Sequence, residues 1–232
     1  IDGKKIAGEM LERLAREPRP SVFLVAILVG RDPSSVSFVR QKERAAQALG
    51  VDFRVHEIDS SLQTDGVASA VRAYIADPAC GGIVVQLPLP PQVSRATILS
   101  EIPIEKDVDV IGNQAIRAFE NKSARVLPPA VGTVRHIILS ILGVSQEAVP
   151  GEEDGAVTAW LSSRRVAVLG RGILVGQPVA CWLDGKVVNL ATIDIGDDHA
   201  PVHDADLVVC GAGQAGALKP DDLRPGAMVV DF

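Results

Sequence analysis

Residues 165–178 read Arg-Val-Ala-Val-Leu-Gly-Arg-Gly-Ile-Leu-Val-Gly-Gln-Pro, and this stretch decides the fold class. A short β-rich run, Val166 to Leu169, leads into glycines spaced G-x-G-x-x-x-G, and a helix is predicted over Leu174 to Leu183. Glycines between a parallel strand and a helix let the backbone approach a phosphate, which the helix N-terminus binds through free N–H groups. The stretch therefore predicts a dinucleotide site, with a spacing one residue longer than the usual fingerprint. On these residues alone, an ordinary strand-to-helix turn remains an alternative.

The rest of the chain shows the same alternation of strands and helices. Apolar or alternating runs predict strands at Val22–Val29, Val51–Ile58, Gly82–Gln86, Arg165–Leu169, Val187–Ile195, Leu207–Cys210 and Met228–Phe232. Helical spacing predicts helices at Lys4–Leu14, from Ser34 or Ser35 as the cap to Leu49, and at Thr64–Ala76, Ser94–Ile102 and Val131–Leu142. The acidic segment Ser145–Gly155 predicts a surface loop. Because this alternation is typical of open parallel sheets, we expect an α/β fold with two domains, residues 1–120 and 121–232.

Composition narrows the class of protein. The chain has 232 residues, 47% of them hydrophobic but only 3% aromatic, which suits helices packed on buried parallel strands. A net charge of −6 without a basic run disfavours nucleic acid as a partner, and no apolar run is long enough to cross a bilayer. Cys80, Cys181 and Cys210 lack metal-ligand spacing, so we expect buried free thiols, a reducing cytoplasm and no metal.

The two ends of the sequence also carry an expectation. There is no initiator Met, and the last residues fall inside a predicted strand. We expect further residues beyond both ends.

The first half of the chain contains four candidate binding segments, and the last of them, Leu127–Gly132, is a rigid turn that either shapes a cleft or only starts a helix. Phe38 and Lys42 share a helix face, where a ring beside an ammonium group can hold a flat ligand and move protons. A solvated surface lysine is the alternative. Gln86 follows a strand at its carboxyl end, where ligands of open α/β sheets bind, and the prolines after it permit a cis peptide.

The third candidate segment is Lys106-Asp107-Val108-Asp109. Its two carboxylates can anchor a polar heterocycle, or they can belong to a charged surface turn. The four histidines show no ligand spacing, and we interpret them as structural or surface residues.

Together and in this order, five segments resemble the methylenetetrahydrofolate dehydrogenase/methenyltetrahydrofolate cyclohydrolase family, over nearly the whole chain. They are the opening helix from Ile1, Val29–Ser35 with Phe38-Val39-x-x-Lys42, Val84-Val85-Gln86-Leu87-Pro88-Leu89-Pro90, Lys106–Asp109 and Gly170–Pro178. The third is the most specific, and the last matches G-R-S-x-x-V-G-x-P with the same extra residue.

The resemblance implies a folate-binding N-terminal α/β domain and a C-terminal Rossmann-type domain with a doubly wound parallel sheet, with an active-site cleft between them. It implies that hydride moves from 5,10-methylenetetrahydrofolate to a nicotinamide cofactor. Water then opens the methenyl product to 10-formyltetrahydrofolate. It also implies a homodimer.

Site roles follow from the same resemblance, position by position. Lys42 handles protons in the hydration step, Gln86 hydrogen-bonds and positions that lysine, and Asp109 grips the pterin. The substrate wall is formed by Phe38, Leu87 and Pro88. The cofactor is bound by Gly170, Arg171, Gly172, Val175, Gly176 and Asp194.

The chain departs from the family pattern in several places. Phe38 replaces a Tyr and Gly172 replaces a Ser, so two hydroxyls are lost, and the segment from Pro128 matches P-C-T-P-x-G poorly. A diverged, non-catalytic folate or nucleotide binder therefore stays an alternative. So does a Rossmann dehydrogenase of the shikimate or amino-acid type, which would explain the glycine loop but not V-Q-L-P-L-P.

The cofactor is expected to be NAD rather than NADP. The second strand of the C-terminal half ends in Asp194, where an acid bonds the ribose diol and repels a 2′-phosphate. Asp197 and Asp198 follow. Arg171 is the nearby cation that favours NADP instead.

Overall fold

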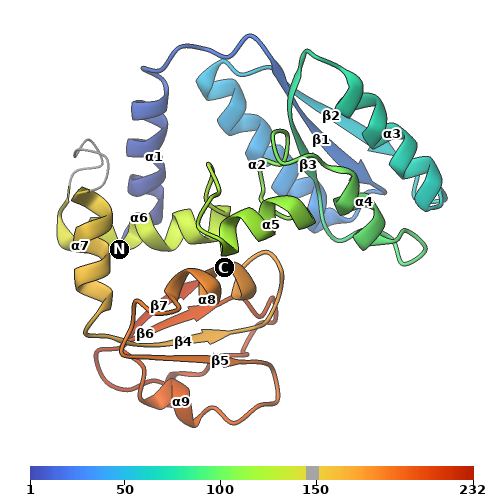
Figure 1. Cartoon of the computed structure of the whole chain (residues 1–232). Coiled ribbons are helices and arrows are strands. Elements are labelled where there is room, and N and C mark those ends of the chain that lie inside the picture. Colours follow the sequence, from blue (N-terminus) through green and yellow to red (C-terminus); the bar gives the residue numbers. More distant parts are fainter. Residues whose placement is uncertain (145–151) are drawn as a thin grey trace. The chain divides into compact units, whose positions relative to one another are not determined.

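Two parallel sheets carry the two halves of the chain (Figure 1). The structure, a computed structural model, describes residues 1–144 and 152–232. The chain divides into an N-terminal unit, Lys4–Val126, and a C-terminal unit, Leu127–Phe232 together with Ile1–Gly3. Each unit has its own sheet and its own buried core.

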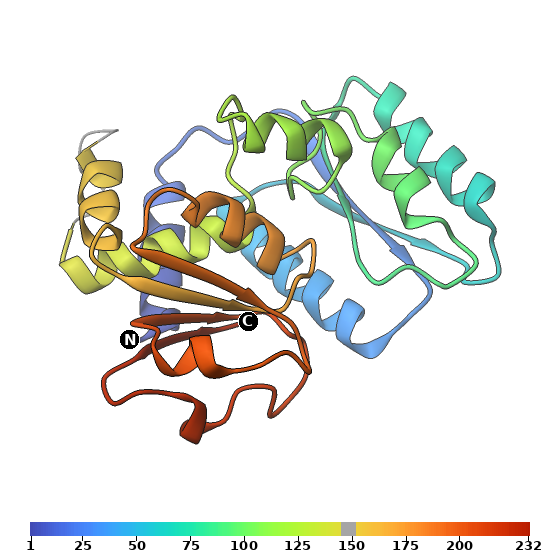
Figure 2. The same cartoon turned by 60° about the horizontal axis from the view of Figure 1, so that its bottom comes forward.

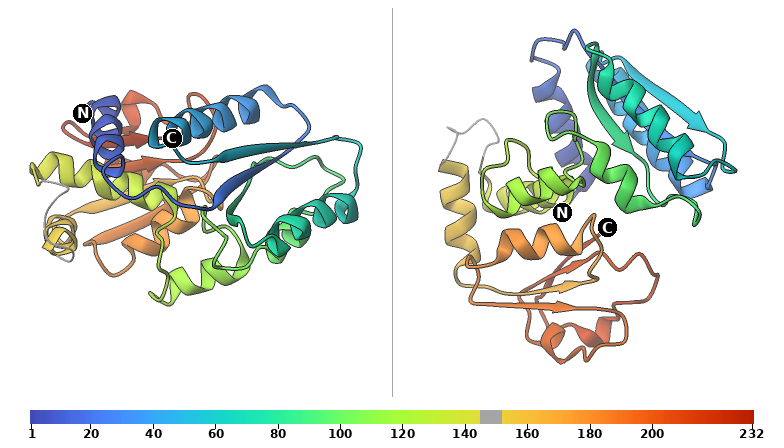
Figure 3. Two further views of the ribbon diagram at one scale, coloured as in Figure 1. Left: turned by 90° about the horizontal axis from the view of Figure 1, so that it is seen from above. Right: turned by 45° about the vertical axis from the view of Figure 1, so that its right-hand side comes forward.

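The N-terminal unit has a sheet of order β2-β1-β3, all parallel. Its strands are β1 (Phe23–Val29), β2 (Phe53–Ile58) and β3 (Cys80–Val85), and its helices are α1 (Gly3–Leu14), α2 (Pro33–Leu49), α3 (Thr64–Ala76), α4 (Arg95–Glu101) and α5 (Asn113–Glu120). The helices α2 and α3 cover opposite faces of the sheet (Figure 3). Burial on both faces explains why the central strand is a continuous apolar run.

The C-terminal unit has a parallel sheet of order β5-β4-β6-β7. Its strands are β4 (Arg165–Leu169), β5 (Asn189–Ile193), β6 (Leu207–Cys210) and β7 (Met228–Asp231). Its helical segments are α6 (Pro129–Leu142), α7 (Glu152–Leu161), α8 (Gly176–Leu183), α9 (Ala200–His203) and the short 3-10 turn η1 (Pro220–Asp222). Figure 2 shows α8 and α9 on opposite faces of the sheet, as in a doubly wound Rossmann-type fold.

The predicted fold class, a two-domain α/β protein with parallel sheets, is confirmed. Every predicted strand is present, with ends that move by up to two residues. None of the described helices has both the length and the apolar content needed to cross a bilayer.

Three local predictions were wrong. Asp32, not Ser34 or Ser35, caps α2, because its carboxylate accepts from the Ser35 N–H at 2.9 Å and Pro33 fits the first helical turn. The predicted loop Ser145–Gly155 is helical from Glu152 onward, and its residues 145–151 lie outside the described part of the chain. Cys181 is exposed rather than buried, because it lies on the outer face of α8, whereas Cys80 and Cys210 are buried. The helix α5 was not predicted.

Candidate active site

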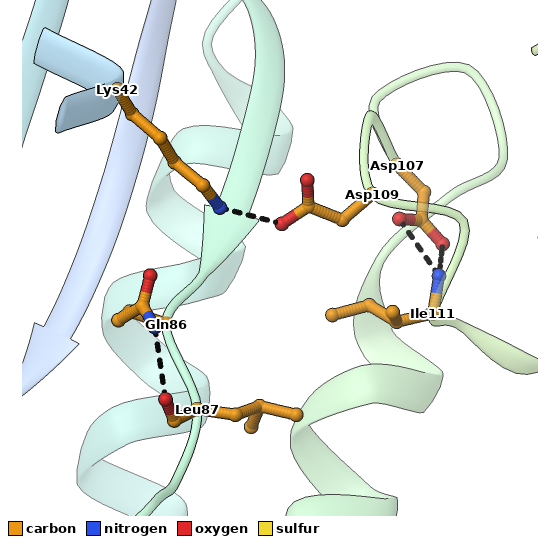
Figure 4. A network of polar contacts seen from close by, with 6 residues as sticks. All are labelled: Lys42, Gln86, Leu87, Asp107, Asp109 and Ile111. Carbon is orange, nitrogen blue, oxygen red and sulfur yellow. Dashed lines mark hydrogen bonds and ion pairs between the residues drawn. The ribbon is translucent and has the colours of Figure 1, made fainter. Parts of the chain in front are cut away.

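The carboxyl edge of the N-terminal sheet brings together polar groups that are far apart in sequence. Lys42, on α2, donates from Nζ to Oδ2 of Asp109 at 3.0 Å (Figure 4). The Lys42 side chain is 37% exposed and that of Asp109 18%. The pair is therefore half-buried, so water screens it only partly while a ligand can still reach it.

Gln86 lies at the end of β3, and its hydrogen bonds differ from the prediction. Its Nε2 donates to the carbonyl oxygen of Leu87 at 2.9 Å, so the predicted bond to Lys42 is not made (Figure 4). Its Oε1 is buried without a partner among the described residues, because the amide is turned toward the backbone of its own turn. A buried acceptor without a donor lowers the stability of the folded protein, so a hydrogen bond from the N–H group of a ligand or side chain to this oxygen would be favourable.

The turn after Gln86 is held to α2. The Leu87–Pro88 peptide is cis, which the proline cluster permits. The Leu87 carbonyl also accepts from the hydroxyl of Ser35, a residue only 3% exposed, at 3.4 Å. Leu87 is half-buried and Pro88 exposed, and the Phe38 ring on the same helix is 56% exposed. An exposed ring on the helix that holds this turn offers a surface against which a flat ligand can stack.

The segment Lys106–Asp109 contributes in a way that its sequence did not reveal. Asp109 faces Lys42, but Asp107 is only 4% exposed, and its carboxylate accepts from the backbone N–H groups of Ile111 and Gly112. Burial raises the pKa of Asp107, and these backbone N–H groups oppose the rise. The two carboxylates thus have different surroundings.

The glycine loop of the C-terminal unit is shaped by close backbone approach. Gly170 has φ +98, and a Cβ at Gly176 would overlap the Gly170 carbonyl. Gly211, which sequence reasoning missed, ends β6 at a point where a Cβ would be 2.5 Å from the Val175 side chain. Gly172 has open space around it. Three glycines are therefore needed by the fold of the loop, and the apolar run before Gly211 was the only signal for the third.

The end of β5 beside this loop is acidic. Arg171 donates from Nη2 to Asp197 Oδ2 at 3.0 Å and to the Thr192 carbonyl at 3.1 Å. The same Asp197 oxygen accepts from the Asp194 N–H at 2.9 Å. The cation of the loop is thus already paired with a carboxylate.

Comparison with known families accounts for both units. Residues 1–109 match the model described as tetrahydrofolate dehydrogenase/cyclohydrolase, catalytic domain, and residues 156–232 match the NAD(P)-binding domain of the same enzymes. The chain belongs to the tetrahydrofolate dehydrogenase/cyclohydrolase family. The candidate pair Lys42–Asp109 lies in the part that matches the catalytic domain, and the glycine loop lies in the part that matches the NAD(P)-binding domain.

Individual members of this family are similar along the whole chain. The bifunctional FolD protein of Bacillus pumilus is 33% identical over 100% of this chain and 79% of its own length, and that of Bacillus subtilis is 31% identical with the same coverage. The Trypanosoma brucei methylenetetrahydrofolate dehydrogenase-cyclohydrolase, solved with NADP and an inhibitor, aligns with a TM-score of 0.83 at 27% identity. That alignment covers 99% of this chain and 76% of that chain.

The family match disfavours the alternative of a shikimate-type dehydrogenase. A shikimate dehydrogenase aligns over 90% of this chain with a TM-score of 0.50 at 12% identity, which indicates a shared fold only. No group of three metal-ligating side chains occurs among the residues that the structure describes.

Proposed function

We propose that this protein oxidises 5,10-methylenetetrahydrofolate to 5,10-methenyltetrahydrofolate with a nicotinamide cofactor and hydrolyses the methenyl product to 10-formyltetrahydrofolate. In the first step a hydride leaves the methylene carbon for the nicotinamide ring. In the second step water adds to the methenyl carbon and the ring opens. The observation that carries the proposal is the Lys42–Asp109 pair beside the buried Gln86 amide, within a chain of this family.

Lys42 is proposed to move the proton in the hydration step. An amine at the end of a flexible chain can reach water beside the methenyl carbon and can both accept and return a proton. Gln86 Oε1 is the proposed second partner of Lys42 Nζ. This oxygen is buried and has no partner among the described residues, and a hydrogen bond from the lysine would satisfy it.

Asp109 is proposed to bind the pterin. Its Oδ2 is engaged by Lys42, so Oδ1 is the oxygen that we assign to a pterin N–H group. Phe38, Leu87 and Pro88 would line the ring, with the Phe38 face for stacking. Because Phe38 has no hydroxyl, Lys42 is the proposed proton-transfer group on this helix. Hydrolysis should therefore depend on this lysine.

The two units are proposed to divide these tasks, with residues 1–120 binding folate and residues 121–232 binding the dinucleotide. The backbone at Gly170, Gly172, Val175 and Gly176, followed by α8, would hold the pyrophosphate. With Gly172 in place of a serine, backbone N–H groups supply most of that contact.

We propose NAD as the preferred cofactor. Asp194 at the end of β5 is suited to a ribose diol, and Arg171, the cation that would hold a 2′-phosphate, is paired with Asp197. The yeast relative described as NAD-dependent and the trypanosomal relative solved with NADP differ in this respect, so family membership alone does not decide it. Steady-state kcat/KM values with the two cofactors test the proposal, and a clear preference for NADP would reverse it.

Two broader properties are also proposed. A cytoplasmic location agrees with the buried free thiols of Cys80 and Cys210, since reducing compartments keep thiols reduced. A homodimer is proposed from the family resemblance, and light scattering of the purified protein tests it.

The Lys42→Ala variant tests the proposed function. We expect methenyl hydrolysis, followed by decay of the methenyl absorbance, to fall by roughly 100-fold or more. Arg40→Ala is the control, since it removes an exposed cation from the same helix. Unchanged hydrolysis in Lys42→Ala would remove this lysine from its role. Ligand binding without turnover in the unmodified protein would favour the non-catalytic alternative.

A further inference from the structure

The loop that carries Asp109 is fixed to the sheet at its start. Lys106 donates from Nζ to the carbonyl oxygens of Tyr74, Ile75 and Asp77, at 3.2, 2.8 and 2.8 Å. These carbonyls lie at the C-terminal end of α3, where a cation satisfies groups that the helix leaves unpaired. The Lys106 carbonyl accepts from the Ile83 N–H of β3 at 2.8 Å. The loop therefore begins from a position set by a helix and a strand.

The loop is fixed again just after Asp109, and the group that does this is Asp107. The Asp107 carboxylate accepts from the Ile111 N–H at 3.1 Å (Figure 4). It also accepts from the Gly112 N–H at 2.7 Å. These bonds close a tight turn with Asp109 inside it. Asp107 is only 4% exposed, and its carboxylate oxygens are engaged by backbone N–H groups inside the turn.

The turn is strained and closely packed, so it depends on those bonds. Val110 has φ +55, a conformation that a β-branched residue rarely adopts. A Cβ at Gly112 would be 2.9 Å from both Asp107 Oδ2 and the Leu99 carbonyl oxygen. Such backbone persists only where its surroundings determine it, and here the Asp107 carboxylate supplies the bonds inside the turn.

We propose that Asp107 is a positioning residue for folate binding, whose carboxylate closes the turn that holds Asp109 against Lys42. The proposal rests on the proposed function, in which Asp109 binds the pterin. Asp107 acts through Asp109 and touches no reactant itself. Loss of the turn would let Asp109 move away from Lys42, and displacements of about 1 Å at such groups cost large factors in activity.

The test is a double-mutant cycle of Asp107→Asn and Asp109→Asn in the purified protein. Asparagine at 107 keeps the shape, but its N–H₂ group replaces the Oδ1 that accepts from the Ile111 N–H at 3.3 Å, and a neutral oxygen replaces the charged Oδ2 that accepts from Ile111 and Gly112. We expect the KM for methylenetetrahydrofolate to rise roughly tenfold in Asp107→Asn, with the KM for the dinucleotide unchanged. In the Asp109→Asn background the further effect of Asp107→Asn should shrink to less than about twofold, because both act through one group. Glu105→Gln, an exposed carboxylate two residues before Asp107, is the matched control.

The outcomes separate the two proposals. If Asp109→Asn raises the folate KM but Asp107→Asn does not, or if the two effects multiply, the positioning role is wrong. If Asp109→Asn leaves the folate KM unchanged, the pterin role of Asp109 fails and the positioning role fails with it. Should Asp107→Asn not fold, Gly112→Ala perturbs the same turn while keeping both carboxylates. The same rise in folate KM, absent in the Asp109→Asn background, is then expected, and an unchanged KM overturns the proposal.

Discussion

The two units build their candidate sites from different materials. In the N-terminal unit, side chains from α2, β3 and the loop around Asp107 form the site, and buried polar groups hold them in place. In the C-terminal unit, the backbone of the glycine loop forms the site, and the side chains near it are exposed. The N-terminal site therefore depends on the side chains that are present. The glycine loop depends instead on the absence of side chains at Gly170, Gly176 and Gly211.

Among substitutions that should affect one site and not the other, Gly176→Ala is expected to have the largest effect on activity. The added methyl group would overlap the Gly170 carbonyl, so the loop must open and its N–H groups must move. We expect kcat/KM for hydride transfer to fall roughly 100-fold, while methenyl hydrolysis stays within about twofold. Gly155→Ala is the control, because this glycine lies on α7 outside the loop and nothing lies within 4 Å of the added atom. An equal loss in both variants would mean that backbone proximity is not what the loop requires.

The cores of the two units should respond alike, in contrast to their sites. Leu183 of α8 and Ile98 of α4 are both fully buried. We expect each substitution by alanine to lower the free energy of unfolding of its own unit by about 2–5 kcal/mol. Chemical denaturation measures this, with the 46% exposed Leu174 replaced by alanine as the control. A much smaller loss at either buried position would show that the core there can collapse around the cavity.

A smaller effect, on the preference between NAD and NADP, is expected from Asp197→Asn. This variant tests whether a side chain also contributes to the cofactor site of the C-terminal unit. The change frees Arg171 from its ion pair but leaves an oxygen to accept from the Asp194 N–H. The ratio of kcat/KM with NADP to that with NAD should rise about tenfold. Asp198→Asn is the matched control, since that carboxylate accepts from the Ala200 N–H but pairs with no described cation. If both variants shift the ratio equally, overall charge decides the preference and Asp197 has no special part.

The smallest expected effect is the pH dependence that Asp107 gives to stability. Burial raises the pKa of its carboxyl, so the folded protein binds this proton more readily than the unfolded chain. Ionised Asp107 therefore lowers stability at neutral pH, and this loss is relieved as the pH falls through the raised pKa toward about 4. The stability of the protein relative to Asp107→Asn should thus improve between pH 7 and about pH 4, as urea denaturation measures. A difference that is constant with pH would contradict the raised pKa.

Much of the fold was predictable because its signals are local. The apolar runs of β1, β4 and β6 reflect burial on both faces, and the Thr64–Ala76 helix was located to the residue. The prediction that Ser34 or Ser35 caps α2 failed because a neighbouring side chain, that of Asp32, accepts the hydrogen bond at the helix N-terminus. Helix α5 was not predicted, and its length does not explain this, since the seven-residue helix α4 was predicted.

The sequence by itself determined the family, the two α/β units and the residue types at both sites, because motif spacing and hydrophobic period are properties of the chain. Only the tertiary structure decided which of those groups meet. It paired Lys42 with Asp109 rather than with Gln86, it buried Asp107 while leaving Asp109 accessible, and it brought Gly211 under the glycine loop. The Lys42–Asp109 and Gly211–Val175 contacts join residues dozens of positions apart, so they depend on how strands and helices pack, which no local pattern records.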